Sequence, residues 1–169
     1  MISLSCYEPH KDKNLVQFLK TYLNKNPCCK ESICRHPKKQ SNSFLFDSKR
    51  KSLKYLKEQF YNSINNNLKK YQVVEEKFWV LFVEENKPTP AVWHHHYQEK
   101  YEGMMQISGI TYITETQLGT EFDTDLYNVR IKPRPNCWFY WDSSILHRPM
   151  LGNQNTDRYV IAAQVVLKT

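Results

Sequence analysis

The chain has 169 residues, of which 40% are hydrophobic and 14% aromatic, and its formal net charge is +7. This composition excludes a disordered polymer, and the length allows one domain with a buried core. No apolar stretch is long enough to cross a bilayer, and no signal peptide is apparent. We therefore expect a protein without a membrane segment that stays in the cytoplasm where it is made.

The first predicted helix runs from Lys11 to Asn24 and the second from Asp47 to Lys70. Apolar side chains recur in both at spacings of three and four, which is typical of a helix with one buried face. Those of the first helix are Leu15, Phe18, Leu19, Tyr22 and Leu23. Those of the second are Leu53, Leu56, Phe60, Ile64 and Leu68, with Asp47 or Ser48 as the predicted N-cap.

The region from Lys11 to Lys70 also holds most of the lysines. Basic proteins attract nucleic acids, but a solvated helical face explains the same charge and is the favoured interpretation. Between the helices, Cys28, Cys29, Cys34 and His36 would suit a zinc ion only weakly, because paired CxxC units are absent. Five cysteines in all, an odd number, do not indicate a secreted disulfide framework.

After Tyr71 short runs rich in Val, Ile, Tyr, Phe and Trp alternate with turn residues, which predicts strands. The predicted strands are Val73 to Glu84, Ala91 to Gln98, Met105 to Thr114, Leu126 to Lys132, Cys137 to Trp141 and Arg158 to Leu167. The predicted turns are Asn86 to Pro90, Gln117 to Thr120, Pro133 to Asn136 and Gly152 to Asp157. Many short strands without intervening helices predict an antiparallel sandwich or barrel. We expect a single domain over residues 1–169, with a helical layer (1–70) packed on a mainly β core (71–169).

Three consecutive histidines stand in one predicted strand. Residues two apart in a strand share a face, so His94 and His96 point to one side and His95 to the other. Two imidazoles on one side of a strand can bind one metal ion, with a third ligand from a neighbouring strand. His147 is the expected donor of that ligand.

Arg158 opens the last predicted strand, 11 positions after His147. A guanidinium is the side chain best suited to hold a carboxylate by two parallel hydrogen bonds. A metal pocket with such an anchor would bind an oxo-acid that also coordinates the metal, leaving a position for dioxygen.

These residues resemble the iron(II)- and 2-oxoglutarate-dependent oxygenases, and in particular a group common in phages and marine microbes. The resemblance covers more than half of the chain. The residues that carry it are Trp93 to His96, Ser108 to Ile113, Gly119 to Phe122, Ser143 to His147, and Arg158.

The resemblance implies a double-stranded β-helix, which is a jelly roll like that of cupins. It implies Fe(II) held by His94, His96 and His147, with 2-oxoglutarate as cosubstrate bound by Arg158, and O2 as oxidant. The implied reaction is hydroxylation of an unidentified small molecule or peptide, with release of succinate and CO2. For a phage protein, the expected cytoplasm is that of the infected cell.

The sequence departs from the usual pattern of that family at two positions. The position of the customary Asp or Glu ligand holds His96; Glu99 is an alternative acid ligand, although three residues of offset turn it to the wrong strand face unless a bulge intervenes. Val160 stands where many members have Ser or Thr. We therefore expect Tyr112 to help Arg158 bind the oxo-acid, with an ordinary core tyrosine as the equal alternative.

Trp138, Tyr140 and Trp141 are the expected substrate-pocket residues, although half of an alternating strand faces away. Two other functions remain open. A three-histidine cupin-type dioxygenase would use the same histidines without 2-oxoglutarate. A non-enzymatic metal- or sugar-binding β-sandwich module would produce no succinate.

Overall fold

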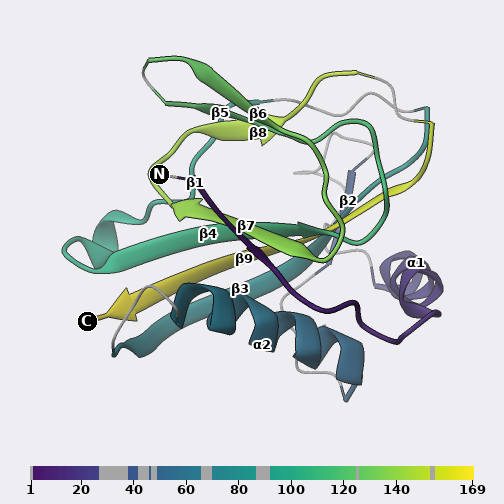
Figure 1. The fold of residues 1–169 in the computed structure, drawn as a ribbon, viewed down its shortest axis with the longest axis horizontal. Helices are drawn as coiled ribbons and strands as arrows, with labels where there is room; N and C mark the ends of the chain where they lie inside the picture. Colours follow the sequence, from purple (N-terminus) through teal and green to yellow (C-terminus); the bar gives the residue numbers. More distant parts are fainter. Residues whose placement is uncertain are drawn as a thin grey trace.

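The computed structural model describes residues 2–26, 38–41, 46, 49–65, 70–86, 92–124, 126–152 and 155–169. This part of the chain is mainly β, with its strands in two antiparallel sheets. The large sheet has the order β1-β7-β4-β9-β3-β2 and the small sheet the order β6-β5-β8 (Figure 1). The strands are β1 (Ile2–Cys6), β2 (Lys38–Gln40), β3 (Gln72–Val83), β4 (Met105–Tyr112), β5 (Thr120–Asp123), β6 (Asn128–Ile131), β7 (Cys137–Asp142), β8 (His147–Pro149) and β9 (Arg158–Lys168).

The large sheet is built around β9, which pairs with β3 on one side and β4 on the other. The strand is buried from Arg158 through Leu167. Its sequence is almost continuously apolar because both faces of the sheet are covered at this point. The last predicted strand is thus the middle of the fold.

Helices α1 (Leu15–Lys25) and α2 (Lys51–Asn65) lie on one side of the large sheet, and the small sheet lies on the other (Figure 1). The apolar face of α2 packs on the sheet through Phe60, whose ring meets the rings of Phe78 and Trp138 edge to face, at centroid distances of 5.6 and 4.9 Å. Gly109 allows this approach, because a Cβ there would stand 2.5 Å from Phe60 Cε2.

The opposite face of the large sheet carries a second apolar cluster, which includes Ile110, Phe139, Trp141 and Ala162. Phe122 of the small sheet packs in the same cluster, with its ring 4.8 Å from that of Trp141. The two antiparallel sheets, packed face to face, are consistent with the predicted jelly roll. Among the described strands no ladder closes the two sheets into a barrel.

Several predicted boundaries were wrong. The described part of the predicted strand Ala91 to Gln98 forms only an isolated bridge at His94, because the residues facing its continuation make the turn at 143–146. Four strands were not predicted: β1, β2, β5 and β8.

The predicted N-cap at Asp47 or Ser48 and the cluster of Cys28, Cys29, Cys34 and His36 lie outside the described residues. Neither α1 nor α2, nor any other helix of the described ranges, has the length and apolar character to span a bilayer.

Candidate metal centre

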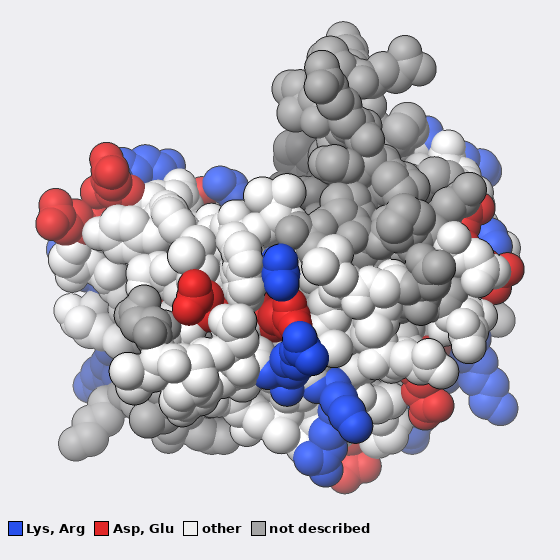
Figure 2. All heavy atoms as spheres, turned by 90° about the horizontal axis from the view of Figure 1, so that it is seen from above, with Lys and Arg blue, Asp and Glu red and all other residues white. Residues whose placement is uncertain are grey.

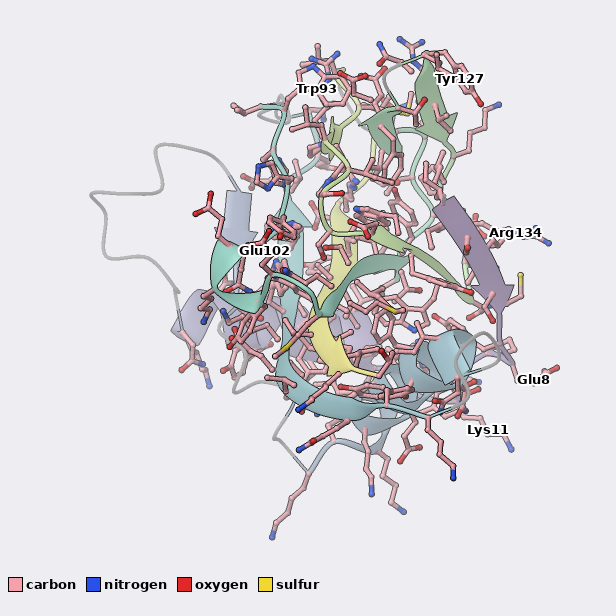
Figure 3. The ribbon with its side chains drawn as sticks, turned by 90° about the vertical axis from the view of Figure 1, so that its left-hand side faces the viewer. Glu8, Lys11, Trp93, Glu102, Tyr127 and Arg134 are labelled. Carbon is pink, nitrogen blue, oxygen red and sulfur yellow. The ribbon has the colours of Figure 1, made fainter. Side chains whose placement is uncertain are left out.

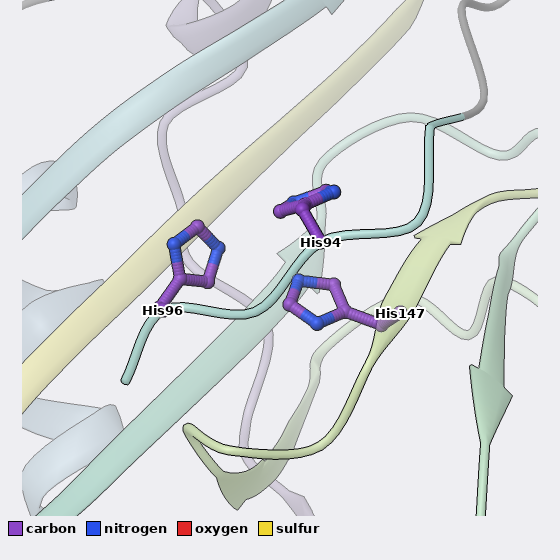
Figure 4. Close-up of side chains that lie close together, drawn as sticks. All are labelled: His94, His96 and His147. Carbon is purple, nitrogen blue, oxygen red and sulfur yellow. The ribbon is translucent and has the colours of Figure 1, made fainter. Parts of the chain in front are cut away.

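Three imidazoles converge between the two sheets. His94 and His96 come from the extended segment 92–98, and His147 is the first residue of β8. One ring nitrogen of each lies within 4.8 Å of the other two (Figure 4). The structure therefore brings together the three histidines that the sequence analysis proposed as ligands of one metal ion.

The backbone holds two of these histidines directly against each other. His94 N donates to His147 O at 3.1 Å, and His147 N donates to His94 O at 2.9 Å. Each ring also has its Nδ1 beside a carbonyl two residues earlier, at 2.9 Å from Val92 O and 3.1 Å from Ile145 O. With Nδ1 as the donor, Nε2 carries the lone pair and is the atom suited to bind a cation.

His96 is fixed by its main chain as well. Its amide donates to Ser143 O at 3.0 Å, and its carbonyl accepts from Gln164 Nε2 at 2.6 Å. The ring of Trp79 stands edge-on, 5.7 Å away between centroids. His95, in contrast, is exposed, so the alternation expected of a strand persists although no regular ladder forms.

A cavity of about 350 Å³ opens from the triad toward β9. Its wall includes Trp79, Thr120, Trp141, Arg158 and Ala162 in addition to the histidines. Trp141 is 2% exposed, and its Nε1 is a buried donor without a partner in the part of the chain that the structure describes. Polar donors thus stand in a mostly apolar enclosure, as in small-molecule sites.

Arg158 is a buried cation without a protein counter-ion among the described residues. It is 5% exposed, its Nη2 donates to Gly119 O at 3.2 Å, and its Nε and Nη1 have no partner there. Two carboxylates that could have paired with it have other partners: Asp157 pairs with Lys20, and Asp142 accepts a hydrogen bond from Ser144. Burial lowers the pKa of Arg158. An unpaired buried charge is costly, so a bound anion would stabilise this guanidinium.

Gly119 places its carbonyl against Arg158 because it has no side chain. A Cβ at this position would lie 1.7 Å from Ile131 O. The next residue, Thr120, lines the cavity and shares a 2.8 Å hydrogen bond with the hydroxyl of Tyr112. Thr120 was missed in the sequence because the preceding glycine indicated a turn, whereas β5 begins there.

Tyr112 lies behind this wall. Its side chain is 1% exposed, and its ring centroid is 5.4 Å from Arg158 Cζ. Burial raises the pKa of its hydroxyl. The residue contacts Arg158 and supports Thr120, and it is not part of the cavity wall itself.

The prediction that Trp138 and Tyr140 line the pocket was wrong. Trp138 is fully buried under α2, where its Nε1 donates to Leu56 O at 3.0 Å, and Tyr140 donates to Ser63 O at 3.3 Å. Side chains of a strand alternate, so these two face the helices while Trp141 faces the cavity. Glu99 lies in the short helix η2 (Glu99–Tyr101), exposed and outside the cavity wall.

The small sheet carries charged side chains of both signs. Buried Glu121 pairs with Arg130 at 2.6 Å and with Arg148 at 2.9 Å, and Arg148 stacks 4.4 Å from the ring of Trp93. Figure 2 shows basic and acidic side chains next to each other in a stripe on this face, and Figure 3 shows Trp93 and Tyr127 at the same end of the molecule. On the face that Figure 2 draws, the described basic side chains therefore form no continuous patch of one sign.

No family model matches the sequence, and no curated protein matches it. Solved structures share the fold. A prolyl hydroxylase from Trichoplax adhaerens, solved with a peptide fragment of hypoxia inducible factor, is 15% identical with a TM-score of 0.69, over 98% of this chain and 83% of that one. The viral collagen prolyl hydroxylase of Paramecium bursaria Chlorella virus-1, in its 2-oxoglutarate complex, is 12% identical with a TM-score of 0.57, over 99% and 96%.

The epimerase SnoN of nogalamycin biosynthesis, in complex with Fe3+ and α-ketoglutarate, is 10% identical with a TM-score of 0.69, over 98% of this chain and 78% of that one. At these identities the likeness concerns the fold. The chain therefore has the fold of 2-oxoglutarate-dependent oxygenases.

Proposed function

We propose that the protein is an Fe(II)- and 2-oxoglutarate-dependent oxygenase, in which His94, His96 and His147 bind the metal and Arg158 binds the cosubstrate. The observation that carries the proposal is the buried guanidinium of Arg158, which has no counter-ion among the described residues and lies on the same cavity wall as the imidazole triad. The fold of the similar solved structures supports it, since two of them contain 2-oxoglutarate or α-ketoglutarate.

The residues fit these ligands chemically. Three imidazoles are suitable donors for a divalent transition metal, and their Nδ1 contacts with carbonyls at His94 and His147 orient the rings. The donors are neutral, so the metal and Arg158 together leave a strongly positive cavity that suits a dianion. Bound iron, 2-oxoglutarate and O2 would supply the oxidising chemistry.

The side chains of the chain would then hold and shield the reactants. Arg158 would grip the distal carboxylate, Thr120 would offer a hydroxyl beside it, and Tyr112 would fix both from behind. Trp79 and Trp141 would exclude water near the metal. The expected products are succinate, CO2 and a hydroxylated small molecule or peptide. A cytoplasmic location, a single domain and kinship with phage and marine oxygenases belong to the same proposal.

Anaerobic titration of the iron-loaded protein with 2-oxoglutarate, followed by the metal-to-ligand absorption band, tests the proposal. Arg158→Ala should weaken cosubstrate affinity by several hundred-fold or more, because loss of one partner of a buried charge pair costs roughly 3–5 kcal/mol. Arg158→Lys should recover only part of it, since a point charge lacks the bidentate fork. Exposed Arg134, drawn in Figure 3, provides the control Arg134→Ala, which should bind normally.

A three-histidine dioxygenase that uses no oxo-acid is the second candidate, because the triad contains no carboxylate. It predicts unchanged behaviour of Arg158→Ala in the titration and no succinate with any substrate pool. Saturable binding that depends on Arg158, followed by succinate formation in air, would exclude that candidate and also a non-enzymatic module.

A further inference from the structure

Two cysteines face each other between the first strand and β7, outside the cavity wall. Cys6 is directly opposite Cys137 in the antiparallel pair, and their Sγ atoms are 2.6 Å apart. Tyr7 N donates to Asn136 O at 2.8 Å, which makes the next pair along the ladder the hydrogen-bonded one. The cysteines therefore occupy a non-hydrogen-bonded pair, in which Cα atoms are about 4.5 Å apart and side chains lie closest.

That geometry is compatible with a covalent link, because disulfides span Cα separations of roughly 4.4–6.8 Å. The two thiols differ in access. Cys6 is exposed on a strand at the sheet edge, whereas Cys137 is buried within the apolar cluster. Both are free in the structure. Burial, together with the contact from Cys6, raises the pKa of the Cys137 thiol to about 12, so the exposed thiol is the one that an oxidant reaches first.

We propose that Cys6 and Cys137 form a reversible disulfide when a small-molecule disulfide such as oxidised glutathione is present. The Cys6 thiolate attacks one glutathione sulfur, and the first glutathione leaves as a thiol. Cys137 then loses its proton, its sulfur attacks Cys6 Sγ, and the second glutathione leaves. The cysteines lose two electrons and two protons, and oxidised glutathione gains them.

The bond would fasten the edge strand to the sheet. β1 pairs only with β7 among the described strands, and β7 also carries Trp141 into the cavity wall. The linked positions are 131 apart in the sequence. Closing so long a loop restricts the unfolded chain considerably, so the oxidised protein should be the more stable form. In a reducing compartment the pair stays open, and an oxidising change closes it.

Incubation of the purified protein with oxidised glutathione tests the inference without metal or cosubstrate. Peptide mapping should find Cys6 joined to Cys137, and the melting temperature should rise by roughly 5–15 °C and fall back after dithiothreitol. Cys6→Ser, which changes an exposed side chain, should show no thiol-dependent shift. In Cys137→Ala, glutathione should remain attached to Cys6 because no second thiol displaces it.

Two results would overturn the inference: glutathione that stays on Cys6 of the unaltered protein, or links that join only Cys28, Cys29 or Cys34. If Cys137→Ala does not fold, Cys6→Ser and the peptide map still decide the question. Neither measurement depends on the proposed oxygenase activity, so one proposal can fail without the other.

Discussion

At the scale of single residues, the third imidazole distinguishes this site most clearly from a two-histidine, one-carboxylate triad. His96→Ala should reduce affinity for Fe(II) or Mn(II) by more than about 100-fold, since even the outer supports of a metal ligand contribute 10–100-fold. Glu99→Gln should leave the affinity unchanged, because Glu99 is exposed and outside the cavity wall. Isothermal titration of both variants measures this; a loss confined to Glu99→Gln would identify the acid as the ligand.

Trp138 and Trp141, on opposite faces of β7, provide a matched pair of variants. Trp138→Phe should lower the free energy of unfolding by about 1–3 kcal/mol, because it removes the hydrogen bond to Leu56 O and part of a packed ring. Its 2-oxoglutarate affinity should stay normal. Trp141→Phe should change that affinity, since Trp141 borders the cavity. Urea unfolding measures the stability and the absorption titration measures the affinity. A normal affinity in Trp141→Phe together with an altered affinity in Trp138→Phe would contradict the packing described.

The site residues show what the local sequence pattern can and cannot predict. The two-residue period identified His94 and His96 as sharing a face, because that rule needs no partner strand. The same period states that Trp138 and Tyr140 share a face but not which face meets the cavity; only α2 on the sheet decides that. Thr120 follows a glycine that resembles a turn signal, whereas the glycine serves the close contact with Ile131.

At the scale of elements, strands β4, β7 and β9 and the second half of β3 are largely buried and were predictable from their apolar runs. β2 and β8 have three residues each, too few to display a period, and they exist because a neighbouring strand offers hydrogen-bonding groups. The prediction of a strand around His94 was wrong for the opposite reason. The segment has the alternating pattern of a strand, but a turn faces its continuation, so only an isolated bridge forms.

Another element, η2, is tied to β3 by one carboxylate. Glu75 accepts hydrogen bonds from Lys77 and Tyr101, which lower its pKa to about 2, and it also pairs with Lys100. Since the folded pKa lies below the usual 4.5, this stabilisation is complete above that pH and is lost as the pH falls toward 2.

Glu75→Gln should therefore cost about 1–2 kcal/mol at pH 7, after allowance for solvent screening of the exposed lysines, and nothing near pH 2. Unfolding curves at several pH values check the difference. Glu58→Gln is the control, because Glu58 pairs only loosely with Lys54 at 3.9 Å on the exposed helix surface. Equal pH profiles for the two variants would refute the role of Glu75.

At the scale of the whole molecule, the proposed ligands would join both sheets, because His147 belongs to β8 and Arg158 to β9. Binding to the folded state alone raises stability by about 2.7 kcal/mol at a hundredfold excess over Kd. Mn(II) should thus raise the melting temperature by roughly 5–10 °C, and 2-oxoglutarate should raise it further. Arg158→Ala should keep the increase in melting temperature caused by Mn(II) and lose the increase caused by 2-oxoglutarate. If the variant keeps both increases, Arg158 does not bind the cosubstrate.

The position of β9 in the sheet has a consequence for how the protein folds. β9 follows every other strand in the chain, yet it separates β3 from β4 and supplies the partner edge of each. Until it docks, two apolar strands have unpaired edges and Arg158 is absent from the cavity. Contacts so distant in sequence are slow to form, so refolding should take milliseconds to seconds, with burial of Trp138 and recovery of the metal site in the same phase. Stopped-flow refolding that restores metal binding before β9 is protected from hydrogen exchange would contradict this order.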